Sequence, residues 1–365
     1  MAHQTLTVRR TWLKVPRSLA LPSLLCFAAA LPGAAWATLS PGLNQNLSLV
    51  HDGIPRVYDV LVPAGYDGSV PVPLVVDMHG FISNKDQQRG LSGFVALAQA
   101  ETFLVAWPQG LFSNGDLAAN TGGPAWNAGG FCCGDAAPQN QSPDDAGFIR
   151  AMVAAIAAEA NVNPQRIYIT GLSNGGAMTH RLACEAADLF AAAAAFSFPN
   201  ALVTPCTPAR PMPILMVASR TDQILPYLGG NVLGDPDLAP LASAAQGFEE
   251  WRTRNACSGP TVVEDQGTTS ECELFTSCAQ GVAVGLCSVD AGAGLLGHVP
   301  YPGLIADGFN STQRAWQFLS SYQMPAATSP VPALDGAGGV LLAALLAGFA
   351  ALRRPRSRGR DARRP

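Results

Sequence analysis

Basic residues are scarce in the body of this chain. Of its 22 Lys and Arg side chains, four lie in residues 1–37 and seven in residues 353–365. Residues 38–352 keep 11 basic and 25 acidic side chains, a net charge of −14, although the whole chain sums to −4. Nucleic acid is bound through clustered Lys and Arg that neutralise phosphates, so it is not expected as a partner. The 48% of hydrophobic residues excludes a mainly disordered chain.

The sequence also lacks any Cys-x-x-Cys pair, and its five histidines are scattered, so no zinc site is expected. Cys26 precedes the body, which keeps eight cysteines. An even number of cysteines in an exported chain predicts disulfides. The four cysteines between residues 257 and 287 are expected to cross-link one local segment. Spacing assigns no partner to the adjacent Cys132 and Cys133.

Residues 1–37 have the pattern of a secretion signal. Four basic residues and no acid precede an apolar run, and Ala35-Trp36-Ala37 follows as a small-x-small cleavage motif. Pro22 and Pro32 interrupt the run, which disfavours a buried N-terminal helix. We predict export and a mature chain that begins at Thr38.

Three segments follow one another at the C-terminal end. Residues 325–335 form a Pro-containing spacer, residues 336–352 carry no charge, and residues 353–365 carry seven arginines. The uncharged segment would be a helix of about 25 Å at ~1.5 Å per residue, enough to cross a bilayer, with the arginines left in the cytoplasm. This order resembles the tripartite C-terminal sorting signals of some Gram-negative surface proteins. It implies contact with the membrane or with sorting machinery; a plain tail anchor is the alternative.

The body, residues 38–324, is expected to form one domain without repeats or long linkers. Short apolar runs alternate with helical patterns, which predicts an α/β fold: a mostly parallel sheet with helices on both faces. Functional residues in such sheets gather at the carboxyl ends of the strands. Asp52-Gly53 predicts a hairpin, and Asp144-Asp145 predicts a helix cap. Strands are expected at 46–50, 56–62, 72–78, 103–107, 166–170, 191–198 and 213–219, and helices at 87–101, 146–160, 174–187, 241–254 and 308–322.

The segment 167–176 reads Ile-Tyr-Ile-Thr-Gly-Leu-Ser-Asn-Gly-Gly and combines a strand, a Gly-x-Ser-x-Gly turn and a helix start. In this context the turn holds its serine in a strained conformation above the sheet. The flanking glycines remove Cβ atoms that would clash with neighbouring segments. We therefore predict that Ser173 is a nucleophile, rather than part of an ordinary Gly-rich turn.

A serine hydroxyl needs a base, and the chain order in this fold is nucleophile, acid, histidine. His298 lies in a Gly- and Pro-rich loop C-terminal to Ser173, and we predict it as the base. His79 is expected to order the loop in which it lies. His180 is expected to be a surface or packing residue of the helix that follows Ser173.

The acid that orients the histidine is predicted to be Asp222, which directly follows a predicted strand. Asp235 and Asp237, later in the same region, are its rivals. Acyl transfer also needs N–H donors for the developing oxyanion. We expect them from the backbones of Asn174, next after the nucleophile, and Phe81, in the loop after an early strand.

These motifs together resemble the secreted poly(3-hydroxybutyrate) depolymerase/feruloyl esterase family of α/β-hydrolases, over nearly all of residues 45–322. The resemblance implies the α/β-hydrolase fold and hydrolysis of carboxylic esters through an acyl-enzyme, without metal or cofactor. The family usually has Trp-Pro-Gly soon after its histidine, whereas residues 298–303 are His-Val-Pro-Tyr-Pro-Gly, so a different pocket rim is expected. The motifs are, in chain order, His79-Gly80-Phe81, Trp126-Asn127 with Cys132-Cys133-Gly134, Asp144-Asp145-Ala146-Gly147-Phe148-Ile149, residues 168–176, Asp222 with Pro226-Tyr227, and His298.

The predicted function is therefore an exported serine ester hydrolase of the polyhydroxybutyrate depolymerase type. A feruloyl or acetyl xylan esterase of the same family is the alternative, since no polymer-binding domain is visible after the predicted body. A serine peptidase of the same fold and a non-catalytic surface binding module are further alternatives. The Ser, Asp and His in chain order argue against the binding module.

Deleting residues 330–365 should release the protein into the medium, because the deletion removes both the apolar segment and the arginine cluster. The measurement is the amount of protein in culture supernatant and in cells, for the full chain and the truncated chain. Equal cell association of the two chains would contradict an anchor.

Overall fold

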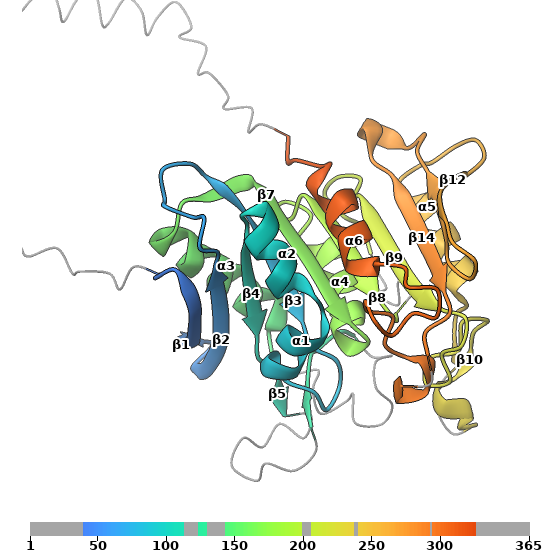
Figure 1. Ribbon diagram of the computed structural model, residues 1–365, viewed down its shortest axis with the longest axis horizontal. Coiled ribbons are helices and arrows are strands. Elements are labelled where there is room, and N and C mark those ends of the chain that lie inside the picture. The colour runs from blue at the N-terminus through green and yellow to red at the C-terminus, as the bar shows by residue number, and fades with distance from the viewer. Residues whose placement is uncertain are drawn as a thin grey trace, which may run out of the picture. The chain divides into compact units, whose positions relative to one another are not determined.

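The computed structural model describes residues 39–112, 123–129, 143–198, 206–236, 240–292 and 294–325 (Figure 1). The predicted secretion signal, most of the spacer, the uncharged segment 336–352 and the arginine cluster lie outside these residues. Within the described part of the chain, none of the helices has the length and apolar character needed to cross a membrane.

A ten-stranded sheet runs through the described chain in the order β1-β2-β4-β3-β7-β8-β9-β14-β13-β12. The six central strands, from β4 to β14, pair in parallel, and antiparallel pairs complete both ends. The ten strands are β1 (Gly42–His51), β2 (Ile54–Val62), β3 (Val72–Met78), β4 (Leu104–Pro108), β7 (Val162–Leu172), β8 (Ala192–Phe196), β9 (Ile214–Ser219), β12 (Val262–Gln266), β13 (Glu271–Phe275) and β14 (Val284–Val289). Two short two-stranded sheets consist of β5 (Leu111–Phe112) with β6 (Pro124–Ala125), and β10 (Gly230–Asn231) with β11 (Pro240–Leu241).

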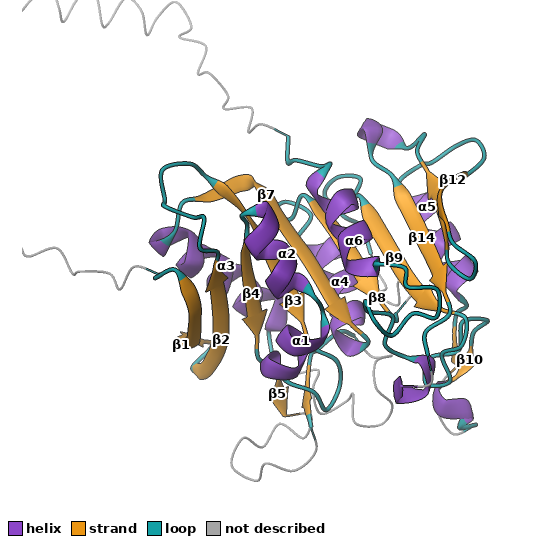
Figure 2. Cartoon of the chain, viewed as in Figure 1, coloured by secondary structure: helices purple, strands orange, loops and turns teal. Residues whose placement is uncertain are grey.

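Helices cover both faces of the large sheet (Figure 2). Successive strand residues point to opposite faces: in β3, Leu74 and Val76 pack in one apolar cluster and Val75 in the other. The first cluster includes residues of α3, α4 and α5, and the second includes residues of α2 and α6. Burial on both faces explains why the central strands are short apolar runs rather than alternating patterns. The helices are α1 (Lys85–Leu91), α2 (Phe94–Glu101), α3 (Asp145–Glu159), α4 (Asn174–Glu185), α5 (Ala244–Arg254) and α6 (Ser311–Ser320).

The predicted strands and most predicted helices are present, with ends that shift by a few residues. One helix prediction was wrong: residues 87–101 form two helices, α1 and α2, because the chain turns at Gly93. Gly93 has φ +77°, a left-handed conformation that glycine adopts without strain. A Cβ there would also lie 3.4 Å from Thr312 Oγ1, so α6 packs close to this break.

The sequence patterns missed β12, β13 and β14, which extend the sheet beyond β9. Disulfides Cys257–Cys278 and Cys272–Cys287 lie within this extension, which confirms that the four cysteines cross-link one local segment. Cys272 and Cys287 are direct partners across the β13–β14 pair. A third disulfide joins Cys184 at the end of α4 to Cys206. The adjacent Cys132 and Cys133 lie outside the described residues.

Candidate active site

Ser173 lies in the sharp turn between β7 and α4. Its backbone has φ 56° and ψ −117°, a strained conformation for a residue with a Cβ, and its N–H donates to Phe196 O at 2.8 Å. Neighbouring backbone comes very close to this turn, since a Cβ on Gly175 would lie 2.3 Å from Met78 O. Glycine is therefore required at position 175 for α4 to start directly against the end of β3.

The loop after β3 touches the same turn. A Cβ on Gly80 would lie 3.3 Å from Ser173 Cβ, so this loop approaches the serine side chain directly. Phe81 follows in that loop, and its N–H makes no hydrogen bond within the described residues. Asn174 is the first residue of α4. The two residues predicted to donate to an oxyanion thus lie on segments adjacent to Ser173.

Asp222 and His298 are paired in the structure. His298 Nδ1 lies 2.7 Å from Asp222 Oδ2, and both side chains are buried. A carboxylate oxygen accepts, so the proton is on Nδ1, which leaves Nε2 as the base of the neutral ring. The other carboxylate oxygen, Oδ1, accepts from the N–H groups of Ile224 and Leu225 at 2.8 and 2.9 Å. These bonds fix the orientation of the carboxylate, and the carboxylate fixes the imidazole.

A glycine lets the two loops approach each other. Gly297 has φ +74°, and a Cβ on it would lie 2.3 Å from Thr221 O. The Gln223 N–H donates to Leu296 O at 3.0 Å across the same contact. The backbone next to His298 therefore packs against the backbone next to Asp222 without an intervening side chain.

The end of β8 connects this pair to the nucleophile turn. Phe196 O accepts the Ser173 N–H, and the next residue, Ser197, donates its hydroxyl to His298 O at 2.5 Å. Phe196 and Ser197, which follow one another in the chain, thus hold Ser173 and His298 at the carboxyl ends of the central strands. The Ser173 hydroxyl makes no hydrogen bond to His298 in this structure, and such bonds commonly tighten only when substrate is bound.

His79 is buried and orders its loop, as the sequence predicts. Its Nε2 accepts from the Gly110 N–H at 2.9 Å, so Nδ1 carries the proton and donates to Gly80 O at 2.7 Å. Burial lowers the pKa of His79 to about 4, which keeps the ring neutral and preserves both hydrogen bonds.

His180 packs within the core of the α4 side of the sheet. Trp251 donates its indole N–H to His180 Nδ1 at 2.9 Å, and His180 Nε2 lies 2.6 Å from Phe198 O. Burial lowers the pKa of this ring to about 4 as well. His180 is therefore a structural residue, in agreement with the packing role expected from its place in the helix.

The segment 123–129 lies over the nucleophile turn. Trp126 donates its backbone N–H to Asn174 Oδ1 at 2.7 Å and its indole N–H to His79 O at 2.9 Å. These two bonds clamp the start of α4 to the loop after β3. The sequence signal for this contact was the Trp126-Asn127 motif, to which sequence reasoning gave no role.

Asp144 and Asp145, at the start of α3, have different roles. Asp144 caps the helix by accepting the Gly147 N–H at 2.9 Å, as predicted. The prediction for Asp145 was wrong, because this side chain turns into the core and pairs with Arg56 at 2.7 Å. Among the rival acids, Asp235 is exposed and Asp237 lies outside the described residues.

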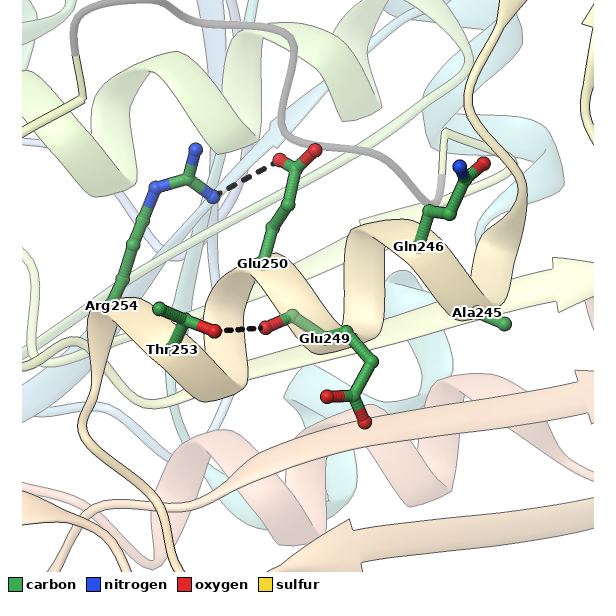
Figure 3. A pocket seen from close by; sticks show the side chains of 6 residues that line it. All are labelled: Ala245, Gln246, Glu249, Glu250, Thr253 and Arg254. Atoms are coloured by element: carbon green, nitrogen blue, oxygen red, sulfur yellow. Dashed lines mark hydrogen bonds and ion pairs between the residues drawn. The ribbon is translucent and has the colours of Figure 1, made fainter.

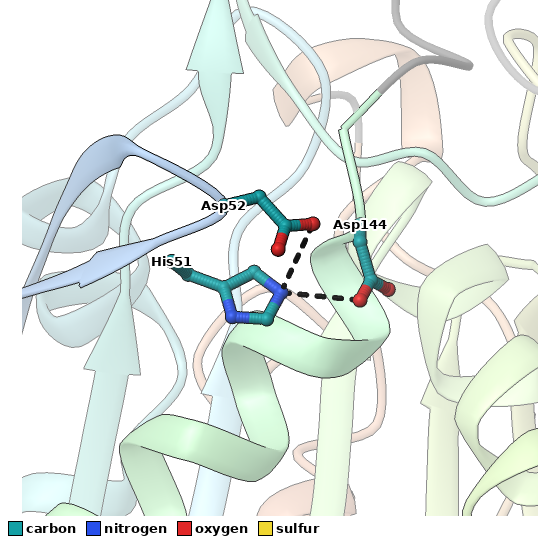
Figure 4. A group of neighbouring side chains, drawn as sticks. All are labelled: His51, Asp52 and Asp144. Atoms are coloured by element: carbon teal, nitrogen blue, oxygen red, sulfur yellow. Dashed lines mark hydrogen bonds and ion pairs between the residues drawn. The ribbon is translucent and has the colours of Figure 1, made fainter.

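Asp144 also contacts the N-terminal hairpin (Figure 4). His51 Nε2 lies 3.1 Å from an Asp144 carboxylate oxygen and 3.7 Å from one of Asp52. Their three ligand atoms lie within 4.8 Å of one another, a spacing that could hold a metal ion. Both carboxylates are exposed and Asp144 already serves as a helix cap, so we assign no metal to this group.

A surface hollow of about 580 Å³ lies on α5 (Figure 3). Residues of this one helix line it, and two of its contacts are local: Arg254 with Glu250 at 3.3 Å, and the Thr253 hydroxyl with Glu249 O at 2.9 Å. The lining residues are Ala245, Gln246, Glu249, Glu250, Thr253 and Arg254. None of the predicted site residues is among them.

Exposed aliphatic side chains lie on the loops beside the Asp222–His298 pair. Leu295 and Leu296 precede His298 and are 62% and 47% exposed. Leu233, in the region that follows Asp222, is 60% exposed, and its N–H donates to Ile224 O at 2.9 Å. Exposed apolar groups beside a site can contact the apolar part of a ligand.

Tyr301 corrects one expectation about this region. Its motif predicted a different pocket rim, but the Tyr301 side chain is fully buried and packs on Phe196, with ring centroids 4.8 Å apart. The departure from the family pattern at this residue therefore lies in the interior.

The architecture matches that of a solved esterase. Acetyl xylan esterase from Aspergillus awamori superimposes with a TM-score of 0.50 at 13% identity, over 76% of this chain and 99% of that chain. The chain has the α/β-hydrolase fold. A model of the prolyl oligopeptidase family also matches residues 138–202, a minor part of the chain that includes Ser173.

Two curated relatives share 32% identity with this chain. Feruloyl esterase B of Piromyces equi matches over 273 residues, 73% of this chain and 45% of that protein. Poly(3-hydroxyalkanoate) depolymerase C of Paucimonas lemoignei matches over 133 residues, 36% of this chain and 29% of that protein. The chain thus spans less than half the length of either relative.

Replacing His180 by Gln should reduce the loss of stability in acid. A histidine whose pKa falls from about 6.5 in the unfolded chain to about 4 in the fold binds a proton only when unfolded in that window, so stability decreases as pH falls through it. Gln can keep both hydrogen bonds but does not titrate. Between pH 7 and pH 4.5, the variant should lose about 2 kcal/mol less than the wild type in urea unfolding. Parallel stability curves for the two proteins would contradict this prediction.

Proposed function

We propose that this chain hydrolyses carboxylic esters with Ser173 as nucleophile, His298 as general base and acid, and Asp222 as the residue that orients His298. The observation that carries the proposal is the 2.7 Å hydrogen bond between Asp222 and His298, formed at the sheet edge where the strained Ser173 turn lies. Neither the fold nor core packing requires this buried pair near a half-buried serine in a strained turn.

In the proposed acylation step, His298 Nε2 accepts the proton of the Ser173 hydroxyl while the serine oxygen attacks the ester carbonyl. The carbonyl oxygen becomes an oxyanion. The imidazolium that forms next to Asp222 then donates its proton to the leaving alcohol as the carbon–oxygen bond breaks. The product is an acyl-enzyme on Ser173.

Deacylation repeats these roles with water as nucleophile. His298 takes a proton from the water as it attacks the acyl carbonyl, and returns that proton to Ser173 when the acid leaves. Asp222 stabilises the imidazolium in both steps and holds the tautomer in which Nε2 can accept a proton. Its two backbone hydrogen bonds keep the carboxylate in place while the charge on His298 changes.

The oxyanion is proposed to bind between the N–H groups of Phe81 and Asn174. Contact of Gly80 with Ser173 brings the Phe81 loop to the nucleophile, and the His79 hydrogen bonds hold that loop rigid. Donors that are already oriented stabilise the developing charge without reorganisation, which is worth roughly 3–4 kcal/mol per donor in measured cases.

For the substrate, we propose esters with an apolar or aromatic acyl group, feruloyl esters first. The feruloyl esterase relative matches most of this chain, and Leu233, Leu295 and Leu296 would supply apolar contacts beside His298. The depolymerase relative supports hydroxyalkanoate oligomers as the second candidate, over a shorter match. The order of the two candidates is thus the reverse of the one favoured by sequence alone.

We also propose that the protein is exported. The composition of residues 1–37 supports this, and so do the three disulfides, which form and persist in oxidising compartments. We further propose that residues 325–365 retain the protein at the cell surface, because a spacer, an uncharged segment and an arginine cluster follow one another there.

Replacing Ser173 by Ala should abolish both hydrolysis of p-nitrophenyl butyrate and labelling by a fluorophosphonate. Asp222→Asn should lower kcat by roughly 10³–10⁴, because the amide no longer favours the reactive His298 tautomer. Asp235→Asn is the matched control, an exposed acid of the same region that should leave kcat unchanged. Retained labelling of the Ser173 variant, or equal losses in the two Asp variants, would refute the assignment.

A panel of esters should separate the two substrate classes. Methyl ferulate, 3-hydroxybutyrate oligomers and acetylated xylan are compared by kcat/KM on the body alone, with a peptide substrate as the test of the peptidase alternative. We expect the highest kcat/KM for the feruloyl ester and no peptide cleavage. A higher value for the oligomers would support the depolymerase activity instead.

A further inference from the structure

Tyr301 lies three residues after His298 and is fully buried. Its hydroxyl accepts a hydrogen bond from Gln88 Nε2 at 2.8 Å. Its ring packs on Phe196, whose backbone carbonyl accepts the Ser173 N–H. One side chain on the His298 loop therefore contacts the strand end that holds the nucleophile turn and, through its hydroxyl, reaches helix α1.

Gln88 continues this connection to the loop after β3. The same Nε2 that donates to Tyr301 donates to Asp77 Oδ1 at 2.7 Å. Asp77 lies on β3, three residues before Gly80, and its Oδ2 accepts the indole N–H of Trp107 at 2.8 Å. The bridge from Tyr301 through Gln88 to Asp77 thus joins the His298 loop to the strand that carries the Phe81 loop.

The amide of Gln88 is only partly satisfied in the interior. Gln88 is 1% exposed, and its Oε1 has no hydrogen-bond partner within the described residues. A buried polar atom without a partner costs free energy, and this cost accompanies the two hydrogen bonds that Nε2 donates to the buried Asp77 and Tyr301 side chains. The two bonds donated by Nε2 are what the amide adds.

We propose that Tyr301 and Gln88 are positioning residues that fix the His298 loop relative to the oxyanion donors. The inference rests on the proposed function, in which His298 and the Phe81 N–H act on one reacting group. Small shifts between such groups lower the rate of the chemical step strongly. Substrate binding is instead expected to depend on the loops that carry Leu233, Leu295 and Leu296. Loss of the bridge should therefore lower kcat and leave KM nearly unchanged.

The first test is Tyr301→Phe, which removes the hydroxyl and keeps the ring on Phe196. We expect kcat for p-nitrophenyl butyrate to fall about tenfold with KM within twofold. Tyr168→Phe is the matched control: Tyr168 is also fully buried, and its hydroxyl donates to Tyr322 O at 2.8 Å, away from the catalytic loops. Its kcat should stay within twofold of wild type. Unchanged kcat in Tyr301→Phe, or equal losses in the two variants, would overturn the proposal.

A second variant, Gln88→Met, keeps the volume and removes both donated bonds, so the test survives if Tyr301→Phe does not fold. The double variant Tyr301→Phe/Gln88→Met should lose no more kcat than Gln88→Met alone, because one bridge is broken in each case. Additive losses would overturn a shared bridge. Ser173→Ala separates the two hypotheses: residual activity in that variant refutes the proposed function, whereas an inactive Ser173 variant together with normal kcat in Gln88→Met refutes only the bridge.

Discussion

The close approach of the β7–α4 turn to the end of β3 is the constraint on which the rest of the site depends. A Cβ at position 175 would lie 2.3 Å from Met78 O, which is too close. Glycine at this position therefore allows α4 to begin directly against the neighbouring strand. This contact sets Ser173 and the Phe81 loop side by side. The end of β8 then adds His298, because Phe196 and Ser197 bind backbone groups of Ser173 and His298 in succession. Close backbone approaches, together with the Ser197 hydroxyl, bring Ser173, the Phe81 loop and His298 to one end of the sheet.

Buried polar side chains hold the backbone segments around Ser173 in place through hydrogen bonds. His79 and His180 are neutral rings that donate on one nitrogen and accept on the other, and burial keeps them so. For Asp77 the direction is opposite: burial raises its pKa to about 7, although the hydrogen bonds from Gln88 and Trp107 act to lower it. Burial therefore displaces the pKa of all three groups from its ordinary value.

The sequence predicts the strands of the large sheet up to β9, the turn at Ser173 and the pairing of Asp222 with His298. Each of these depends on residues a short distance apart or on the order of residues in the chain. Prediction from the sequence failed where distant contacts decide. The break at Gly93 depends on α6 packing against it, and a lone glycine inside a helical pattern gives no such signal. Strands β12 and β13 mix acidic with apolar residues and lie at one end of the sheet. The buried place of Tyr301 follows from contacts with Gln88 and Phe196, more than 100 residues away in the chain.

The three disulfides have a consequence for the order of assembly. They join cysteines 22, 21 and 15 residues apart, so each closes a short loop whose ends can meet without the rest of the fold. The Asp222–His298 hydrogen bond spans 76 residues, and the Gln88–Tyr301 bond spans 213. Each disulfide can therefore form before these two hydrogen bonds, which join segments much farther apart in the chain.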